Sequence, residues 1–535
     1  MSKQKQAMNK VAAKTETSKS FSVDLVINNT QALLITLGVA LVSYIFSFFY
    51  TSFYQGEEGA QYMNALGFWK YPNSILGNWP KTGWKLIYAP VVLFGKQGVL
   101  IANCLFSAFT GFFAYKLYQK ITGKQSALPI ILLATQTLWF MLSFKFYSEI
   151  PTAFLLTVAL YFYNSNKYIL FALFASYVLL LRQEFVFIYP YFAFVLLKRK
   201  QWIAFFTLGL FPVLYNIWGW QVTGDMLYSL HESQKTAAEY KKSYPRQGFD
   251  HYPMMSAVIF SMVSVTLVVT YLSQAITKQL QKVEWALLIP ALGFVFIHSL
   301  FNLQSYEILT STGGNLRYLL VISPLIAVLA TLALKEMPTI KNKYLLLIVL
   351  IPFLGFVMGN MTFSHNWILM DKENVDRDRL PVLFCIAVII LLLFVQNILL
   401  RNRLVALLCI LTVLVYIRPK ELCCDENFEQ KKIVEYIQEN KLDNKPLIQN
   451  LALFNYFYDK NAWEFKNGNA GMYGDSSLNK APVGSIIIWD SHYATKYGKV
   501  EISYFEKNFA KYKMLKQFRA EDNTFAAIVF EKIAL

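Results

Sequence analysis

Long apolar runs recur along most of this 535-residue chain and restrict what it can fold into. Residues 33–53, 381–400 and 404–417 contain no charged side chain. Alone or with their flanks, such runs can cross a hydrocarbon core, which takes roughly 20 helical residues. Hydrophobic residues make up 56% of the sequence and charged residues 16%, which excludes disordered, collagenous and disulfide-scaffold classes. The sequence therefore predicts an α-helical polytopic membrane protein.

Apolar windows of this length predict about thirteen transmembrane helices. They lie near residues 31–53, 98–117, 127–144, 150–164, 168–182, 184–197, 202–219, 254–274, 284–301, 317–334, 344–359, 381–400 and 404–417. The polar arm before the first run and the run itself are both too long for a cleavable signal peptide. The first span is therefore expected to remain as an anchor.

The distribution of positive charge predicts the orientation. Lysine and arginine outnumber aspartate and glutamate by 50 to 33, a net charge of +17 that would suggest nucleic-acid binding in a soluble protein. Here the basic residues fall in the N-terminal arm and in every second connection, which the positive-inside rule places in the cytoplasm. The longer alternate connections, 54–97, 220–253, 302–316 and 360–380, are expected outside. No nucleic-acid partner is predicted.

Three parts follow from this reading: a cytoplasmic basic arm (1–30), a transmembrane domain (31–417) and a soluble tail (418–535). An odd number of spans places the tail outside the cytoplasm. Its sequence predicts a helix at 426–439, short strands at 446–449, 485–489 and 525–530, and turns around 467–475. We therefore expect a small extracytoplasmic α/β domain at the C-terminus. The usage of Lys, Asn, Ile and Tyr is typical of an AT-rich bacterial genome, so the expected location is the bacterial inner membrane.

The five cysteines show neither metal-ligand nor disulfide spacing. Cys104, Cys385 and Cys409 lie in apolar runs and are interpreted as small buried hydrophobes. The vicinal Cys423 and Cys424 have no role that the sequence defines.

Acidic residues next to two outward span ends are the first candidates for chemistry. Glu57 and Glu58 follow the first span, and Tyr62 lies shortly after them. Glu149 stands at the outer junction between the third and fourth spans. Such carboxylates suit a general base or a ligand for a divalent cation. Ordinary loop acids and helix-capping residues have the same spacing, so both readings stay open.

Basic residues at two further outward ends complete the candidate set. Arg182 and Glu184 interrupt apolar sequence between the fifth and sixth spans, as an ion pair between helices or as part of a site. Arg317 and Tyr318 follow two glycines, a pattern that suits phosphate binding as well as a snorkelling arginine. His298, inside the ninth span, is more typical of a hydrogen-bonded core residue than of a participant.

The order of these motifs resembles the GT-C class of membrane glycosyltransferases. An acidic pair follows the first span, another acid follows the third, Arg-x-Glu comes two spans later, and Gly-x-x-Arg-Tyr precedes a proline. The pattern is closest to the protein O-mannosyltransferase and lipid A aminoarabinose transferase branch, over about residues 31–335. This resemblance implies a mannosyltransferase-like enzyme, moving a hexose or pentose from a polyprenyl-phosphate donor to a hydroxyl on protein, lipid or glycan.

The resemblance also implies roles for individual residues. Glu57 matches the acid assigned as catalytic base, Glu58 its neighbour, and Glu149 the second acidic position. Arg317 matches the arginine associated with the lipid-linked phosphate, and Arg182 matches an arginine in the fifth-span region. The donor phosphate is therefore expected to bind near Arg317, Arg182 and Tyr318. The family usually has Asp where this chain has Glu57, and Tyr62 stands one residue further on than in some members. The resemblance therefore leaves open whether Glu57 or Glu58 is the base.

The chemistry of these residues agrees with that assignment. Inverting transfer needs one carboxylate to take the acceptor proton, and a departing phosphate needs positive charge more than an acid. A divalent cation held by Glu57 and Glu149 is an alternative, although no His or Cys cluster accompanies them. Competing hypotheses are a polysaccharide ligase or polymerase, which the lysines and Arg246 of loop 220–253 would suit, and a transporter or lipid flippase.

Overall fold

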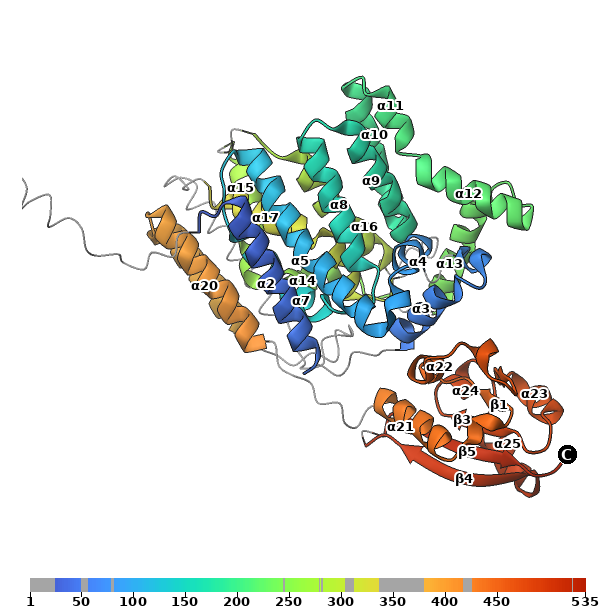
Figure 1. Ribbon diagram of the computed structural model, residues 1–535. Helices are drawn as coiled ribbons and strands as arrows, with labels where there is room; N and C mark the ends of the chain where they lie inside the picture. The colour runs from blue at the N-terminus through green and yellow to red at the C-terminus, as the bar shows by residue number, and fades with distance from the viewer. Residues whose placement is uncertain are drawn as a thin grey trace, which may run out of the picture.

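The computed structural model describes residues 25–49, 56–77, 81–243, 246–278, 280, 282–303, 312–335, 380–416, 426–521 and 523–535. The predicted span at 344–359, most of the 360–380 loop and the pair Cys423 and Cys424 lie outside these ranges. The remainder forms a large helical bundle and a small C-terminal unit beside one end of it (Figure 1).

The helical part runs from residue 29 to residue 416. Its α-helices are α2 (Asn29–Ser47), α3 (Gly56–Gly67), α4 (Thr82–Tyr88), α5 (Gly95–Thr122), α6 (Leu128–Ala134), α7 (Thr137–Leu142), α8 (Glu149–Asn164), α9 (Tyr168–Leu181), α10 (Tyr189–Lys198), α11 (Trp202–Thr207), α12 (Leu210–Thr223), α13 (Tyr228–Ser243), α14 (His251–Phe260), α15 (Met262–Ile276), α16 (Trp285–Phe301), α17 (Ser323–Ala333), α19 (Leu380–Phe394) and α20 (Ile398–Tyr416). Its 3₁₀ segments are η1 (Pro72–Ile75), η2 (Val92–Phe94), η3 (Gln183–Phe187) and η4 (Leu316–Ile322).

Four helical segments among the described residues are long and apolar enough to cross a membrane: Asn29–Ser47, Val92–Thr122, Trp202–Thr223 and Leu316–Ala333. The bent pair α14 and α15, which meet at 117°, would make a fifth. Several other predicted spans are present as shorter pieces. Residues 127–144, for example, form α6 and α7, separated at the buried Gln136, whose side-chain amide donates to the Ser323 carbonyl. The helical class is confirmed, and the count of about thirteen spans is not.

The connection after α3 folds back onto the bundle. Trp69, after the end of α3, is 53% exposed, whereas Trp84 is completely buried. Its helix α4 approaches α9 so closely that a Cβ on Gly83 would lie 2.9 Å from the Leu180 backbone. This glycine therefore allows the outer connection to pack against a bundle helix.

The C-terminal unit is a five-stranded sheet between helices. The strands are β1 (Leu447–Gln449), β2 (Asn469–Ala470), β3 (Ile486–Asp490), β4 (Tyr512–Arg519) and β5 (Ala526–Lys532), in the order β2-β1-β3-β5-β4. β1 pairs in parallel with β2 and β3, whereas β5 is antiparallel to β3 and β4. The helices are α21 (Glu426–Glu439), α22 (Phe454–Tyr458), α23 (Gly474–Lys480), α24 (Tyr493–Lys496) and α25 (Ile502–Lys507), with 3₁₀ segments η6 (Leu442–Asn444), η7 (Ala462–Glu464) and η8 (Phe509–Lys511).

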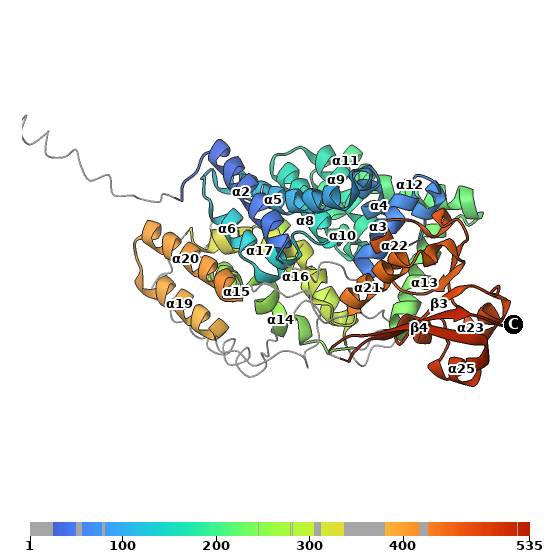
Figure 2. The ribbon, with the colours of Figure 1, turned by 60° about the horizontal axis from the view of Figure 1, so that its bottom comes forward.

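Alternating side chains of β3 bury both faces of this sheet. Ile486 and Ile488 pack with α21 and α22, while Ile487 and Trp489 pack with α23 and α25. This is the two-residue period of a strand covered on both sides. The α21 helix and three predicted strands are confirmed. Figure 2 shows α22 next to α3, where this unit approaches the helical bundle.

Candidate functional site

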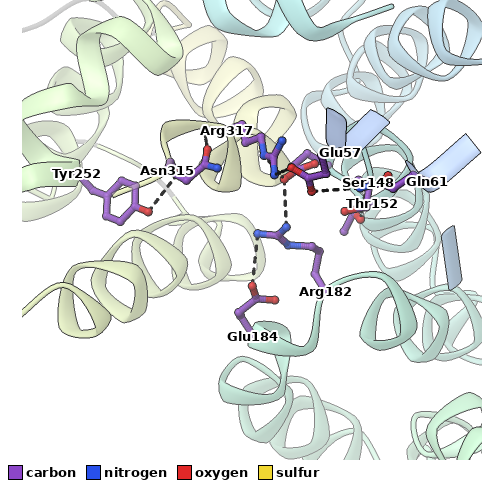
Figure 3. Close-up of polar contacts among 10 residues, drawn as sticks. Glu57, Gln61, Ser148, Thr152, Arg182, Glu184, Tyr252, Asn315 and Arg317 are labelled. Carbon is purple, nitrogen blue, oxygen red and sulfur yellow. Dashed lines mark hydrogen bonds and ion pairs between the residues drawn. The ribbon is translucent and has the colours of Figure 1, made fainter. Parts of the chain in front are cut away.

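Four segments distant in the sequence bring charged side chains together near α3. Glu57 lies in the first turn of α3, where the partial positive charge of a helix N-terminus favours a carboxylate. Glu149 is the first residue of α8, and Arg182 follows the last residue of α9. Arg317 lies at the start of η4. The four side chains therefore meet where these elements begin or end, and Figure 3 shows Glu57, Arg182 and Arg317 pointing toward one another.

Arg317 bridges the two carboxylates of the cluster. Its Nη2 lies 2.6 Å from Glu57 Oε2, and its Nε lies 3.4 Å from Glu149 Oε1. Arg182 adds a second guanidinium, with Nη1 3.1 Å from the same Glu149 oxygen. The other side of Arg182 faces Glu184, at 3.4 Å. Three carboxylates and two guanidiniums thus form one connected network.

Glu57 and Glu149 differ in their access to solvent. The Glu57 side chain is 32% exposed and has one guanidinium partner, while its second oxygen accepts a hydrogen bond from Gln61 at 3.1 Å. The Glu149 side chain is 3% exposed and has two guanidinium partners. Glu57 is therefore the carboxylate that an incoming hydroxyl reaches more easily.

Glu58 points away from this network. Its side chain is completely buried, with one oxygen 3.5 Å from Lys145 Nζ and the other accepting the Phe146 backbone N–H at 2.9 Å. Lys145 is completely buried as well. Glu58 thus links α3 to the segment before α8. This position is structural.

Tyrosines form the aromatic walls of the site. The guanidinium of Arg182 lies 4.3 Å from the centre of the Tyr318 ring, and that of Arg317 lies 4.0 Å from the Tyr147 ring. Both distances suit cation–π contacts, which hold an arginine while leaving its N–H groups available. The sequence indicated Tyr318, whereas Tyr147 carried no signal beyond standing two residues before Glu149.

Tight backbone geometry at Gly314 holds Arg317 in place. Gly314 has a φ of +74°, and a Cβ there would lie 2.8 Å from His251 Nε2. That nitrogen lies 2.7 Å from the Gly314 carbonyl oxygen, and the Asn315 side chain caps η4 by accepting the Arg317 N–H at 3.2 Å. The glycine pair before Arg317 therefore forms a turn against His251.

His298 lies behind the arginines rather than among them. It is completely buried, with its ring 5.8 Å from the Tyr318 ring and 4.5 Å from that of Phe294. Neither ring nitrogen has a hydrogen-bond partner in the part of the chain that the structure describes. The prediction of a hydrogen-bonded core histidine is thus right in its burial, but the structure shows no hydrogen bond.

Lys81 is a further charged residue of the site that sequence reasoning missed. Burial lowers the pKa of its ammonium, while the carboxylates of Glu184, Glu149 and Glu57 act in the opposite direction and Arg182 acts with burial. The net shift of the Lys81 pKa is downward, and Lys81 lies within electrostatic reach of three carboxylates of the site. By contrast, Lys85 on the next turn donates to the Ser74 carbonyl.

The described residues contain no group of three His, Cys, Asp or Glu side chains that could hold a metal ion. The pair suggested for a cation, Glu57 and Glu149, flanks Arg317, whose guanidinium stands between the two carboxylates.

Arg246, in the 220–253 connection, is hydrogen-bonded to the backbone after α16. Its guanidinium donates to the carbonyls of Phe301 and Leu303, both at 3.2 Å, and so fastens this connection.

Comparison with known proteins identifies the architecture. No protein-family model matches the sequence, and no curated protein matches it. Two crystal structures of ArnT from Cupriavidus metallidurans do match in three dimensions: one bound to undecaprenyl phosphate (TM-score 0.60, 10% identity) and one in the apo state (TM-score 0.59, 11% identity). Each match covers 94% of this chain and 98% of the ArnT chain.

The chain shares the fold of ArnT. The resemblance to the GT-C class and its lipid A aminoarabinose transferase branch, which the motif order indicated, is confirmed at the level of fold. Because both matches extend over nearly the whole chain, the ArnT-like fold includes the C-terminal unit as well as the bundle.

That C-terminal unit contacts the helix that carries Glu57. A Cβ on Gly59 of α3 would lie 2.3 Å from Leu453 Cδ2 and 3.1 Å from Tyr456 Cβ. The Tyr456 ring packs edge-on against Tyr62 at 5.5 Å. Burial, with a contribution from Asp459, raises the pKa of the Tyr62 phenol to about 12. Tyr62 therefore supports the packing of α3 rather than facing the arginines.

We expect Gly59→Val to weaken this contact and to lower activity by displacing α3. Forcing extra atoms into a packed interface typically costs about 1–3 kcal/mol. Gly38→Val in α2 is the matched control, because a Cβ at Gly38 has nothing within 4 Å. Thermal unfolding in detergent, together with the activity assay described below, checks the prediction. Equal behaviour of the two variants would show that the contact does not position Glu57.

Proposed function

We propose that this chain is an inverting membrane glycosyltransferase. It transfers a sugar from a polyprenyl-phosphate-linked donor to a hydroxyl acceptor on protein, lipid or glycan. The observation that carries the proposal is the bridge from Glu57 through Arg317 to Glu149, at the meeting point of four segments in an ArnT-like fold. One ArnT crystal structure contains undecaprenyl phosphate, the kind of lipid that such a donor would release.

The arrangement of the site supports Glu57 as the general base and Glu58 as a structural residue. The Glu57 carboxylate takes the proton of the acceptor hydroxyl, and the hydroxyl oxygen forms a bond to the anomeric carbon. The bond from that carbon to the phosphate oxygen breaks on the opposite face, and the phosphate leaves with the electron pair. The anomeric configuration is therefore inverted.

The cations of the site hold the departing phosphate. Arg317 and Arg182 present planar guanidiniums that can pair with phosphate oxygens in bidentate fashion. Tyr318 holds Arg182 in position through its ring. Because Arg317 pairs with Glu57 at 2.6 Å, a donor phosphate that engages Arg317 competes with this ion pair and leaves Glu57 able to accept a proton.

The membrane arrangement follows the charge distribution. We propose a cytoplasmic arm (1–30), a transmembrane domain (31–417) and an extracytoplasmic domain (418–535), with the active site on the extracytoplasmic face of the inner membrane. The C-terminal unit then shapes the acceptor side of the site. Protease digestion of a C-terminally tagged chain in sealed inverted and right-side-out vesicles tests the orientation, and digestion in inverted vesicles alone would contradict it.

Deletion of the gene, followed by mass analysis of surface glycans, lipids and glycoproteins, tests the function. We expect one product to lose the mass of one sugar residue and to regain it when the parent gene is restored. The Glu57→Gln variant should not restore it. Unchanged products in every fraction would contradict the proposal.

Replacement of Arg317 by lysine should weaken donor binding although the charge is kept. One ammonium cannot bridge Glu57 and Glu149 as the guanidinium does, and it lacks the planar fork for phosphate. A hydrogen bond to a charged group contributes about 1.5–3 kcal/mol. We therefore expect the Michaelis constant for the donor to rise about tenfold or more, since 1.4 kcal/mol is a factor of ten.

The exposed Arg199, outside this cluster, supplies the control Arg199→Lys, and the Michaelis constant for the acceptor should change little in either variant. Parent-like donor kinetics for both Arg317→Lys and Arg317→Ala would remove Arg317 from the phosphate site. Arg182 would then be the next residue to test.

A further inference from the structure

A second convergence of cations lies at the other end of the bundle. A cavity of about 180 Å³ opens between the C-terminal ends of α5 and α17, the N-terminal end of α20 and the segment before α2. Its polar wall contains Lys124, Gln125, Ser126, Lys335, Asn402 and Arg403. Three cations from three separate segments therefore line one small cavity, and its described lining contains no carboxylate.

Two buried atoms of this wall have unmet hydrogen-bonding capacity. Nε of Arg403 and Oδ1 of Asn402 have no partner in the part of the chain that the structure describes. A buried polar atom without a partner costs free energy, so a ligand that draws these two side chains toward the cavity and supplies partners is stabilised there. Arg403 requires an acceptor and Asn402 requires a donor. An anionic oxygen beside a hydroxyl group meets both requirements.

The cavity lies at the opposite membrane face from the Arg317 cluster. Arg317 is the second residue of the 18-residue span Leu316–Ala333, and Lys335 stands two residues beyond its end. At about 2.0 Å per residue in η4 and about 1.5 Å per residue beyond it, the two positions are about 30 Å apart along the span. That is close to the thickness of a hydrocarbon core, about 30 Å. In Figure 1 the end of α20 that borders the cavity points away from the C-terminal unit.

Exposed apolar side chains flank these cations. Val26, Ile398 and Leu399 line the same cavity and are 56%, 43% and 51% exposed. In a membrane protein such side chains contact acyl chains. The cavity therefore offers a polar, cationic pocket next to a lipid-facing surface, which suits a lipid head group better than a free anion.

We propose that this cavity binds the phosphodiester head group of an anionic phospholipid in the leaflet opposite the active site. The phosphate engages Lys124, Lys335 and Arg403, and a head-group hydroxyl donates to Asn402. Basic pockets between transmembrane helices are known to take such head groups. Phosphatidylglycerol combines the required anion and hydroxyl. The proposal does not depend on the transferase function.

Native mass spectrometry of the full-length protein, titrated with phosphatidylglycerol or phosphatidylcholine, tests this site. We expect the parent to bind phosphatidylglycerol about tenfold or more tightly than phosphatidylcholine. A preference of this size corresponds to one charge-assisted hydrogen bond. Arg403→Gln and the double variant Lys124→Gln, Lys335→Gln should each lose this preference. Lys124→Gln alone, at an exposed side chain, should reduce it without affecting folding.

Lys167→Gln is the matched control, because Lys167 is an exposed lysine that precedes α9 and does not line the cavity. Its preference for phosphatidylglycerol should equal that of the parent. An equal loss in Lys167→Gln would show general surface attraction and overturn the site. Absence of any preference for phosphatidylglycerol in the parent would also overturn the proposal. Displacement of the lipid by millimolar inorganic phosphate would overturn it as well, because it would identify a site for a free anion.

Discussion

Glu57→Gln should nearly abolish sugar transfer while leaving the fold intact. The amide keeps the shape of the side chain but cannot accept the acceptor proton, and general base catalysis typically contributes about 10²–10⁴-fold. Donor binding should persist or tighten, because the variant removes the carboxylate that pairs with Arg317 at 2.6 Å. We therefore expect kcat to fall by about this factor without a rise in the Michaelis constant for the donor.

Steady-state kinetics with a polyprenyl-phosphate-linked sugar, alongside thermal unfolding, provide the measurement. Glu232→Gln, in α13 and outside the cluster, controls for the loss of a carboxylate on the outer connections. Near-parental kcat in Glu57→Gln would exclude Glu57 as the base. Glu149, the other carboxylate on Arg317, would then take its place as the candidate.

Lys145→Met should cause the largest loss of stability. Lys145 Nζ lies 3.5 Å from Glu58, and both side chains are completely buried, so the variant leaves a buried carboxylate without its ion-pair partner. Breaking a buried ion pair in this way typically costs about 3–5 kcal/mol. The double variant Glu58→Gln, Lys145→Met removes both charges and should recover most of this loss.

Denaturant titration in mixed micelles measures the free energy of unfolding for the parent, both single variants and the double variant. A coupling energy near zero would show that the pair does not stabilise the fold. The same series tests the assignment of Glu58 as structural: transfer by the double variant should recover with its stability. A stable double variant without transfer would instead place Glu58 in the chemistry.

The charged residues of the site could be predicted because charges are rare in apolar sequence. Glu149, Arg182 and Arg317 each interrupt or flank a run of hydrophobic residues, where an ionisable group is expensive. The structure brings all three together with Glu57. Lys81 could not be found in this way, because it lies in a mixed polar connection where a lysine is ordinary.

Neighbouring residues could not be distinguished by sequence. Glu57 and Glu58 are adjacent and chemically identical, and only the rotation of α3 directs the first to Arg317 and the second to Lys145. The local sequence pattern also failed to predict one strand of the C-terminal sheet. The strand β4 (Tyr512–Arg519) was missed because it is a largely exposed edge strand containing lysines, without an apolar alternation.

Breaks within apolar runs explain why the predicted number of transmembrane helices was not confirmed. Apolar sequence is continuous through Gln136, and through Ser261, where α14 and α15 meet at 117°. At the first of these breaks, the hydrogen bond from the Gln136 side chain to the Ser323 carbonyl forms only when distant segments pack together. Hydropathy reports length and composition, so it cannot locate such breaks.

The most direct test of the central claim is the fate of the donor. Purified protein is incubated with polyprenyl-phosphate-linked hexoses and aminopentoses and with membranes from a strain lacking the gene, and products are identified by mass spectrometry and NMR. We predict that one donor releases polyprenyl phosphate and an equal amount of glycosylated acceptor with inverted anomeric configuration, and that Glu57→Gln prevents both. Transfer with retained configuration, or no consumption of any donor, would contradict the account.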